Sequence, residues 1–196
     1  DGTDSSFGGT LNAVSLGEHK IETAYTYSGG YYDRSVKEFY GFDSVKTLYA
    51  DGSYKTTEYY NDQYYNKGSV KAETLYSDSG NALTYSYTQL DESPYMRPVS
   101  STGRTYDYDN DDSYNEKVTT YADYDSWGNV QSCTDTISGL GTELKLYAAF
   151  TYANNTELYL HNMPASILVY GYDPDGSRTL LRKRCGTYND KGRLSV

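Results

Sequence analysis

The residues with the strongest claim to chemistry are the acidic side chains of the run 106–112. This run reads Tyr-Asp-Tyr-Asp-Asn-Asp-Asp, and carboxylate oxygens are ligands that Ca²⁺ takes in proteins. Counted from Asp107, an EF-hand loop would need glycine at its sixth position and glutamate at its twelfth, where Asp112 and Val118 stand. The run therefore favours a solvated acidic loop over a calcium site, and we expect neither metal nor cofactor.

Histidine and cysteine are too sparse for a conventional catalytic site. His19 and His161 stand in unrelated stretches, without a Gly-x-Ser-x-Gly elbow or a cysteine partner. Cys133 and Cys185 form no Cys-x-x-Cys, which leaves either a disulfide or, more simply, two free thiols. Neither common glycine-rich phosphate loop occurs. The sequence predicts no catalytic residue, and an enzyme would need one of the histidines beside a carboxylate in a pocket.

Two further features bear on binding. Trp127 is either an exposed platform for stacking a sugar or, as we favour, a cover for a hairpin corner. The basic stretch 178–184 reverses the acidic balance locally and offers a dock for an acidic neighbour or cargo. Strand alternation would place Arg182 and Arg184 on one side and Lys183 on the other, which an ordinary solvated strand would also show.

Tyrosine and glycine define the elements that must carry these side chains. Twenty-six of 196 residues are tyrosine, and several open a phrase in which an Asx residue and a glycine follow closely. An aromatic suits a pleated surface and the Asx and glycine residues reverse the chain, so each phrase predicts a hairpin tip. The clearest copies are 124–129, 172–176 and 188–194, and further glycine-centred turn signals are 28–30, 51–52, 66–68, 78–81 and 101–103.

The stretches between the turn signals alternate with a period of two. Leu83, Tyr85 and Tyr87 would share one face of a strand, and 21–27 and 145–152 alternate similarly. No stretch has a convincing helical period. We predict an all-β fold with almost no helix: a twisted antiparallel hairpin meander over 21–196, after a frayed segment 1–20, with its best candidate for a break at 91–103.

Composition limits the core and the partners. Tyrosine outnumbers leucine, and its hydroxyl needs water or a partner, so a thin layer suits it better than a deep globular centre. Seventeen Lys and Arg against 27 Asp and Glu, a net charge of −10, argue against nucleic acid and anionic membranes. No apolar run approaches the ~20 residues that span a bilayer. Because the chain begins at Asp1 without methionine, we expect a piece of a longer polypeptide.

An ordered set of stretches resembles a known family. The phrase Tyr-x-x-x-Gly-Arg-Leu at 188–194 and its relative at 124–129 resemble the YD repeat of RHS proteins, teneurins and toxin-complex B subunits. The stretch 37–45, Lys-Glu-Phe-Tyr-Gly-Phe-Asp-Ser-Val, is similar to the segment that introduces the repeats in toxin-complex B and SpvB-like proteins. Phe150 to Asn155 and Met163-Pro164 resemble the strand and loop that follow. The likeness covers the chain from about Tyr25 to its C-terminus.

The resemblance implies a strip of a large β-shell that encloses, carries or presents a toxin or effector of a secreted or surface-exposed bacterial protein. Its partners would be adjoining repeats of its own parent chain and the cargo, and its open edges invite edge-to-edge self-association. The family's self-cleaving aspartate motif is only superficially similar to 172–177, so no protease activity is carried over. The alternative is a tyrosine-rich extracellular module that binds glycans or a cell-surface partner.

The residues that the repeat phrases and the introducing segment single out have structural roles, in which glycine permits positive φ and the aromatic packs on a neighbouring hairpin. They are Phe39, Gly41, Phe42, Tyr124, Asp125, Gly128, Asn129, Tyr172, Asp173, Gly176, Tyr188, Gly192, Arg193 and Leu194.

Overall fold

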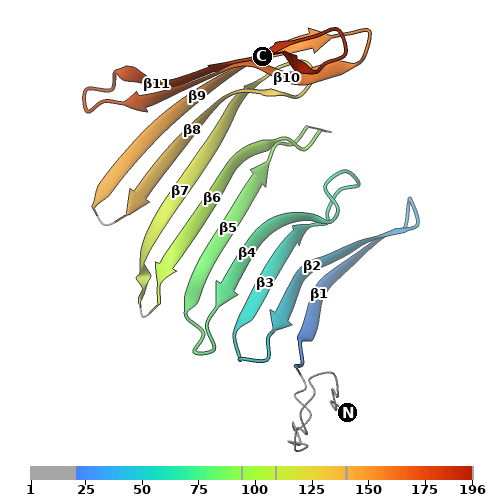
Figure 1. The fold of residues 1–196 in the computed structure, drawn as a ribbon. Coiled ribbons are helices and arrows are strands. Elements are labelled where there is room, and N and C mark those ends of the chain that lie inside the picture. The colour runs from blue at the N-terminus through green and yellow to red at the C-terminus, as the bar shows by residue number, and fades with distance from the viewer. Residues whose placement is uncertain (1–20, 94, 109, 140, 196) are drawn as a thin grey trace, which may run out of the picture.

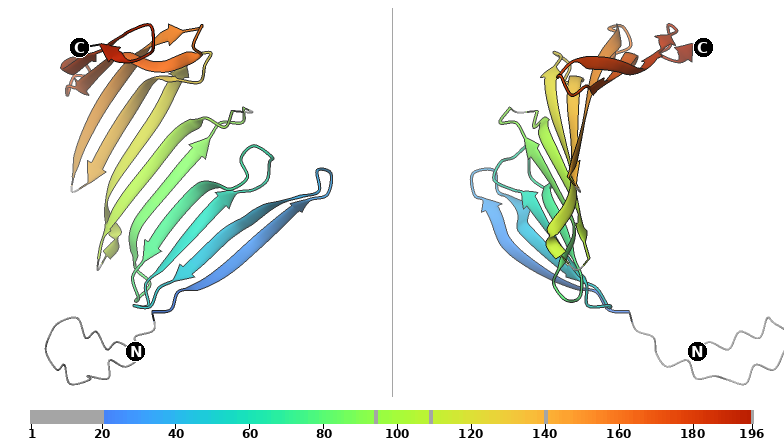
Figure 2. Two further views of the ribbon diagram at one scale, coloured as in Figure 1. Left: turned by 45° about the vertical axis from the view of Figure 1, so that its right-hand side comes forward. Right: turned by 90° about the vertical axis from the view of Figure 1, so that its left-hand side faces the viewer.

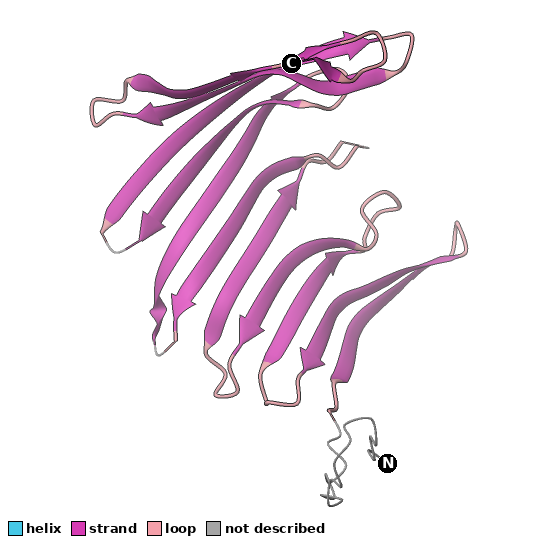
Figure 3. Ribbon diagram, viewed as in Figure 1, coloured by secondary structure: helices cyan, strands magenta, loops and turns pink. Residues whose placement is uncertain are grey.

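The computed structural model describes residues 21–93, 95–108, 110–139 and 141–195, and within them every regular element is a strand (Figure 3). The strands are β1 (Ala24–Asp33), β2 (Glu38–Leu48), β3 (Tyr54–Tyr60), β4 (Ser69–Tyr76), β5 (Ala82–Leu90), β6 (Pro98–Asp107), β7 (Asn110–Tyr124), β8 (Val130–Gly139), β9 (Thr142–Asn155), β10 (Leu160–Tyr172), β11 (Arg178–Cys185), β12 (Thr187–Tyr188) and β13 (Leu194–Ser195). The described residues contain no helix long and apolar enough to cross a membrane.

The sheet topology is a simple meander. Strands β1 to β11 form one sheet in which each strand pairs antiparallel with the next one in sequence, so β1 and β11 lie at opposite ends (Figure 1). Strands β12 and β13 form a separate two-stranded hairpin. The prediction of an all-β antiparallel meander is confirmed. The expectations for residues 1–20 and for His19 lie outside the described residues.

The described part of the sheet is one curved layer with little interior (Figure 2). Its buried apolar residues are Tyr40, Ala72 and Met163. A fold of this kind lacks the facing layer that normally covers a sheet. Cohesion must therefore come from the backbone ladder and from contacts between side chains on adjacent strands.

A band of tyrosine rings and cations crosses the face of the sheet that carries Tyr85. The rings of Tyr54 and Tyr76 stack with their centroids 4.6 Å apart. The Arg104 guanidinium carbon lies 4.7 Å from the ring centroid of Tyr114, and each such contact contributes about 0.5–1 kcal/mol at an exposed site. This tyrosine–cation band comprises Lys46, Tyr54, Tyr76, Tyr85, Arg104, Tyr106, Tyr114, Lys145, Tyr147, Tyr170, Tyr172 and Arg178.

The turns predicted at 28–30 and 101–103 are wrong, because the glycines there lie inside strands. Residues 28–30 lie within β1, where the side chain of Asp43 occupies the space that a Cβ on Gly29 would need. Residues 101–103 lie within β6, which pairs with β5 and β7 on its two sides. The expected break at 91–103 is correspondingly shorter, since β6 already begins at Pro98.

Replacing Gly128 by valine is expected to lower the free energy of unfolding by about 1–3 kcal/mol, because a β-branched residue is strained at its φ of +84°. A Cβ on Gly128 would meet no atom within 4 Å, so the loss reports backbone strain and not a clash. Chemical denaturation of variant and parent measures it.

Gly103→Val is the matched control. A Cβ on Gly103 also meets no atom within 4 Å, but Gly103 has no positive φ and lies in a strand, where valine is favoured. Its stability should equal or exceed that of the parent. Equal losses in the two variants would contradict the role assigned to the backbone angle.

Candidate functional site: the repeated hairpin turns

Five turns in the described part of the chain share one hydrogen-bond frame. In each, the amide of the first residue donates to the carbonyl of the fifth, and the amide of a glycine in fourth place donates to the carbonyl of the first. All five glycines have positive φ, between 71° and 91°. This is the geometry of a three-residue hairpin loop closed by a glycine bulge, which fixes the register of the strands that it joins. The turns are 49–53, 77–81, 125–129, 173–177 and 189–193.

In the turns that begin at Asp125 and Asn189, the first side chain accepts hydrogen bonds from the backbone amides that follow it. Asp125 Oδ1 accepts hydrogen bonds of 2.9 Å from the amides of Trp127 and Asn129. Asn189 Oδ1 makes the same pair of bonds, to the third and fifth residues of its own turn. Aspartate and asparagine are interchangeable here because both present an oxygen at the same place.

Asp173 departs from this pattern. Its Oδ2 accepts hydrogen bonds from the hydroxyls of Ser177, at 3.2 Å, and Thr179, at 2.7 Å. The Ser177 amide instead donates to Asp175 Oδ1 at 2.9 Å. The turn keeps its glycine, Gly176, and its backbone frame, so the frame tolerates a different side chain as its acceptor.

The tyrosine that precedes a turn ties it to a neighbouring strand. The Tyr124 hydroxyl donates to the Pro98 carbonyl oxygen at 2.5 Å, and the Tyr188 hydroxyl donates to the Pro164 carbonyl oxygen at 2.9 Å. Burial raises the pKa of the Tyr124 phenol, which keeps its proton in place for this bond. Tyr172 differs: its ring receives Lys145 and Arg178 in the tyrosine–cation band.

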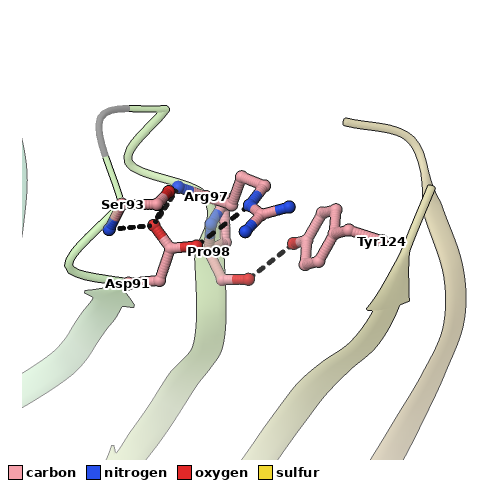
Figure 4. Close-up of polar contacts among 5 residues, drawn as sticks. All are labelled: Asp91, Ser93, Arg97, Pro98 and Tyr124. Carbon is pink, nitrogen blue, oxygen red and sulfur yellow. Dashed lines mark hydrogen bonds and ion pairs between the residues drawn. The ribbon is translucent and has the colours of Figure 1, made fainter. Parts of the chain in front are cut away.

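A turn that begins at Asp91, within the predicted break at 91–103, packs beside Tyr124 on the side of its hydroxyl (Figure 4). Asp91 Oδ1 accepts hydrogen bonds from the Ser93 hydroxyl at 2.6 Å and the Arg97 amide at 3.0 Å, and Asp91 Oδ2 lies 2.9 Å from Arg97 Nε. The Arg97 guanidinium carbon is 5.0 Å from the centroid of the Tyr124 ring. Burial raises the pKa of Asp91, but the bonds from Ser93 and Arg97 outweigh it and the net pKa is lowered. An Asp-x-Ser spacing was the available signal.

The stretch 37–45, which resembles the segment that introduces the repeats, lies almost wholly in β2 and forms an aromatic cluster with β1. The Phe42 ring centroid lies 4.8 Å from that of Tyr27 and 5.2 Å from that of Phe39. Gly41 has φ of +103°, beside the irregular register at Tyr31 and Tyr32. The buried amide of Asn61 donates to the Gly41 carbonyl oxygen at 3.4 Å. Glycine at this position therefore belongs to a β-bulge that redirects the strand.

Trp127 stacks on His161 of β10. The two ring centroids are 3.5 Å apart with an interplanar angle of 4°, and Asn129 Nδ2 donates to the His161 carbonyl oxygen at 2.6 Å. Both ring nitrogens of His161 are buried and have no hydrogen-bond partner among the residues that the structure describes. The indole thus covers the corner between one turn and the next hairpin, although 54% of Trp127 remains exposed.

The remaining chemical candidates are not brought together. Cys133 and Cys185 are both free. Within the described residues, no group of three or more His, Cys, Asp or Glu side chains is placed to hold a metal ion. Arg193 follows its turn glycine and Leu194 pairs with Tyr188 across the last hairpin. The structural roles assigned to the phrase residues stay predictions.

Asp125→Asn is expected to preserve the fold at neutral pH and to weaken its acid sensitivity. Burial raises the pKa of Asp125, but hydrogen bonds from Asn129, Trp127 and Gly128 outweigh it and the pKa is lowered. Because the pKa is lower in the folded state than in the unfolded state, the ionised carboxylate stabilises the folded protein above about pH 4. This stabilisation is lost as the pH falls through the pKa of the folded state. Asparagine keeps the acceptor oxygen but does not titrate, as Asn189 illustrates.

Urea denaturation of parent and variant between neutral pH and about pH 2 measures this difference. The control is Asp125→Ala, which removes the acceptor as well as the charge and should destabilise the turn already at neutral pH. Parallel pH dependence in the parent and Asp125→Asn would contradict the assigned contribution.

Comparison with known proteins supports the family resemblance. Residues 10–73 match the family model described as the insecticide toxin TcdB middle/N-terminal region. No curated protein matches the sequence. TcdB2-TccC3 without its hypervariable C-terminal region shares the fold with a TM-score of 0.66 and 12% identity, over 89% of this chain and 14% of that one.

Two further structures are similar to the same extent. A Tc holotoxin pore from Photorhabdus luminescens gives a TM-score of 0.68 at 12% identity, and TcdB2-TccC3-Cdc42 gives 0.65 at 12%. Each match covers 88% of this chain and 14% of the other. At this identity the likeness is one of fold. The chain therefore has the fold of a segment of the TcdB2-TccC3 structures, and its residues 10–73 carry the TcdB match, which together confirm the expected resemblance to the RHS/YD toxin-complex proteins.

Proposed function

We propose that this chain is a non-enzymatic strip of the wall of an RHS/YD-type shell. One observation carries the proposal: a curved single-layer sheet whose first and last strands, β1 and β11, each have an unpaired edge among the described residues (Figure 2). An unpaired edge leaves backbone groups that a further strand satisfies. The fold match, which takes up 14% of the TcdB2-TccC3 chain, supports a segment of something larger.

The lateral contacts suit a wall. The shared turn frame fixes each hairpin, and hydroxyls such as those of Tyr60 and Tyr152 donate to carbonyl oxygens of other strands at 2.8 and 2.9 Å. These contacts link strands one or two places apart within the same sheet and need no second layer. The chain can therefore extend by adding hairpins, as repeat proteins do.

The partners follow from this role. We assign the two open edges to adjoining repeats of the parent polypeptide and the enclosed space to a toxin or effector region. We infer that the assembled protein acts outside the bacterial cell, and the names of the matched proteins, an insecticide toxin and a holotoxin pore, support this inference.

Cysteines placed on the two faces of β5 test enclosure. Ser86 and Gln89 are both exposed, and their odd spacing puts them on opposite faces of one strand. In the parent polypeptide, a bulky maleimide should label one of Ser86→Cys and Gln89→Cys quickly and the other at least about tenfold more slowly, because only one face meets bulk solvent.

The labelling is done with Cys133 and Cys185 replaced by serine, and the isolated chain is the control. There both sites should react at similar rates, since both are exposed. Equal rates in the intact parent polypeptide would overturn enclosure by this sheet.

A binding module is the second candidate, and an exposed aromatic cluster favours it. Tyr25, Tyr27 and Tyr32 are 58%, 53% and 53% exposed on β1, and Phe39 is 50% exposed on β2. Exposed aromatic rings are typical of contact surfaces. A glycan array separates the candidates: binding that disappears in a Tyr25→Ala/Tyr27→Ala variant of unchanged stability supports the module, and no binding by the parent chain rejects its glycan form.

A further inference from the structure

The outer edge of β11 combines an open backbone with unpaired positive charge. All eight residues of β11 are exposed, and the strand pairs on one side only, with β10. Opposite Arg182, Lys183 and Arg184, β10 presents the apolar residues Val169, Leu168 and Ile167. None of these three cations has a hydrogen bond, ion pair or ring contact in the described part of the chain.

Inside the sheet, three strand cations form an ion pair with a carboxylate on a neighbouring strand, and others, such as Lys46 and Lys145, lie over tyrosine rings. Lys55 Nζ of β3 lies 2.8 Å from Glu73 Oε1 of β4. Arg104 Nε lies 2.6 Å from Glu116 Oε2, which stands directly opposite it on β7. Lys117 of β7 extends the pattern with an ion pair to β8, at 2.8 Å from Asp135 Oδ2. Arg182, Lys183 and Arg184 also lie within a strand, but no strand pairs with the outer side of β11 to supply them with a carboxylate.

Resting on the proposed role as a strip of a larger sheet, we propose that the β11 edge receives an acidic strand. The incoming strand pairs along the open backbone and places carboxylates against Arg182 and Arg184 on one face and Lys183 on the other. Backbone hydrogen bonds supply the affinity of such strand addition. Exposed ion pairs add little affinity each, so the charges act mainly to select partner and register.

The pattern of acidic residues that the incoming strand must carry distinguishes that strand from a second copy of the chain. Three consecutive cations alternate between faces, so the partner needs acidic residues at about three consecutive positions. The open edge of β1 has no carboxylate from Ala24 to Tyr32 and does not offer that pattern. A strand of the parent polypeptide with a short acidic run does.

The proposal is tested with synthetic peptides that match the eight residues of β11. One peptide has three consecutive glutamates flanked by valine and threonine, and two others carry glutamine or lysine in place of glutamate. The glutamate peptide should bind the chain on the order of tenfold more tightly than the glutamine peptide at low salt, and the lysine peptide should bind weakest. N-methylation of alternate amides should abolish binding.

Charge reversal on the protein provides the matched comparison. An Arg182→Glu/Lys183→Glu/Arg184→Glu variant should prefer the lysine peptide. An Arg34→Glu/Lys37→Glu/Lys191→Glu variant changes the net charge equally at exposed positions in turns and should keep the preference for glutamate. Unchanged preference in the β11 variant would overturn the proposal.

The outcomes distinguish this inference from the role on which it rests. If the glutamate and glutamine peptides bind with equal affinity and N-methylation abolishes binding, the acidic partner is overturned but the open edge is retained. The cations would then serve only to oppose edge-to-edge aggregation. Binding of the N-methylated glutamate peptide would show charge attraction without strand pairing and overturn the proposal. No binding by any peptide would overturn both the inference and the continuing sheet.

Discussion

Backbone hydrogen bonding between consecutive strands is the interaction on which the rest of this structure depends. Within the described residues no second layer packs against the sheet. Each inner strand, from β2 to β10, is therefore held by the two strands beside it. This explains why tyrosine dominates the composition. A tyrosine ring can lie half-exposed against the adjacent strand while its hydroxyl reaches a carbonyl oxygen or water, whereas a leucine of similar exposure gains no polar contact.

The turns convert this ladder into a defined register. A meander with one-layer packing has few buried side chains to penalise a slipped strand, and a slip of one residue would exchange the two faces. A glycine at positive φ in all five turns, helped in two of them by an Asx acceptor at the start of the turn, fixes the length of the loop and hence the pairing. The tyrosine before the turn then secures the hairpin to its neighbour, as Tyr124 does through Pro98 and Arg97.

The ends of the sheet differ in a way that suits a segment of a wall. β1 is nearly uncharged and aromatic, while β11 is cationic and entirely exposed. Two β11 edges repel one another, so the ends are not equivalent binding surfaces. In a continuing sheet, such a difference assigns each edge its own neighbour.

The sequence by itself determined the local elements: alternation predicted the strand containing Leu83 and Tyr87, and the Tyr-Asx-Gly phrases marked three of the five turns that share a frame. These features are readable because their physical causes lie within a few residues. The turn signals at 28–30 and 101–103 were misread because only the pairing of β1 and β6 with their neighbours shows that those glycines are inside strands. Tertiary structure alone decided the stacking of Trp127 on His161, the support of Tyr124 by Asp91 and Arg97, and the crossing of one face by a tyrosine–cation band. The first two of these join residues from different hairpins, and the band runs across many strands. The distances between such residues depend on strand register and sheet curvature, which no local pattern encodes.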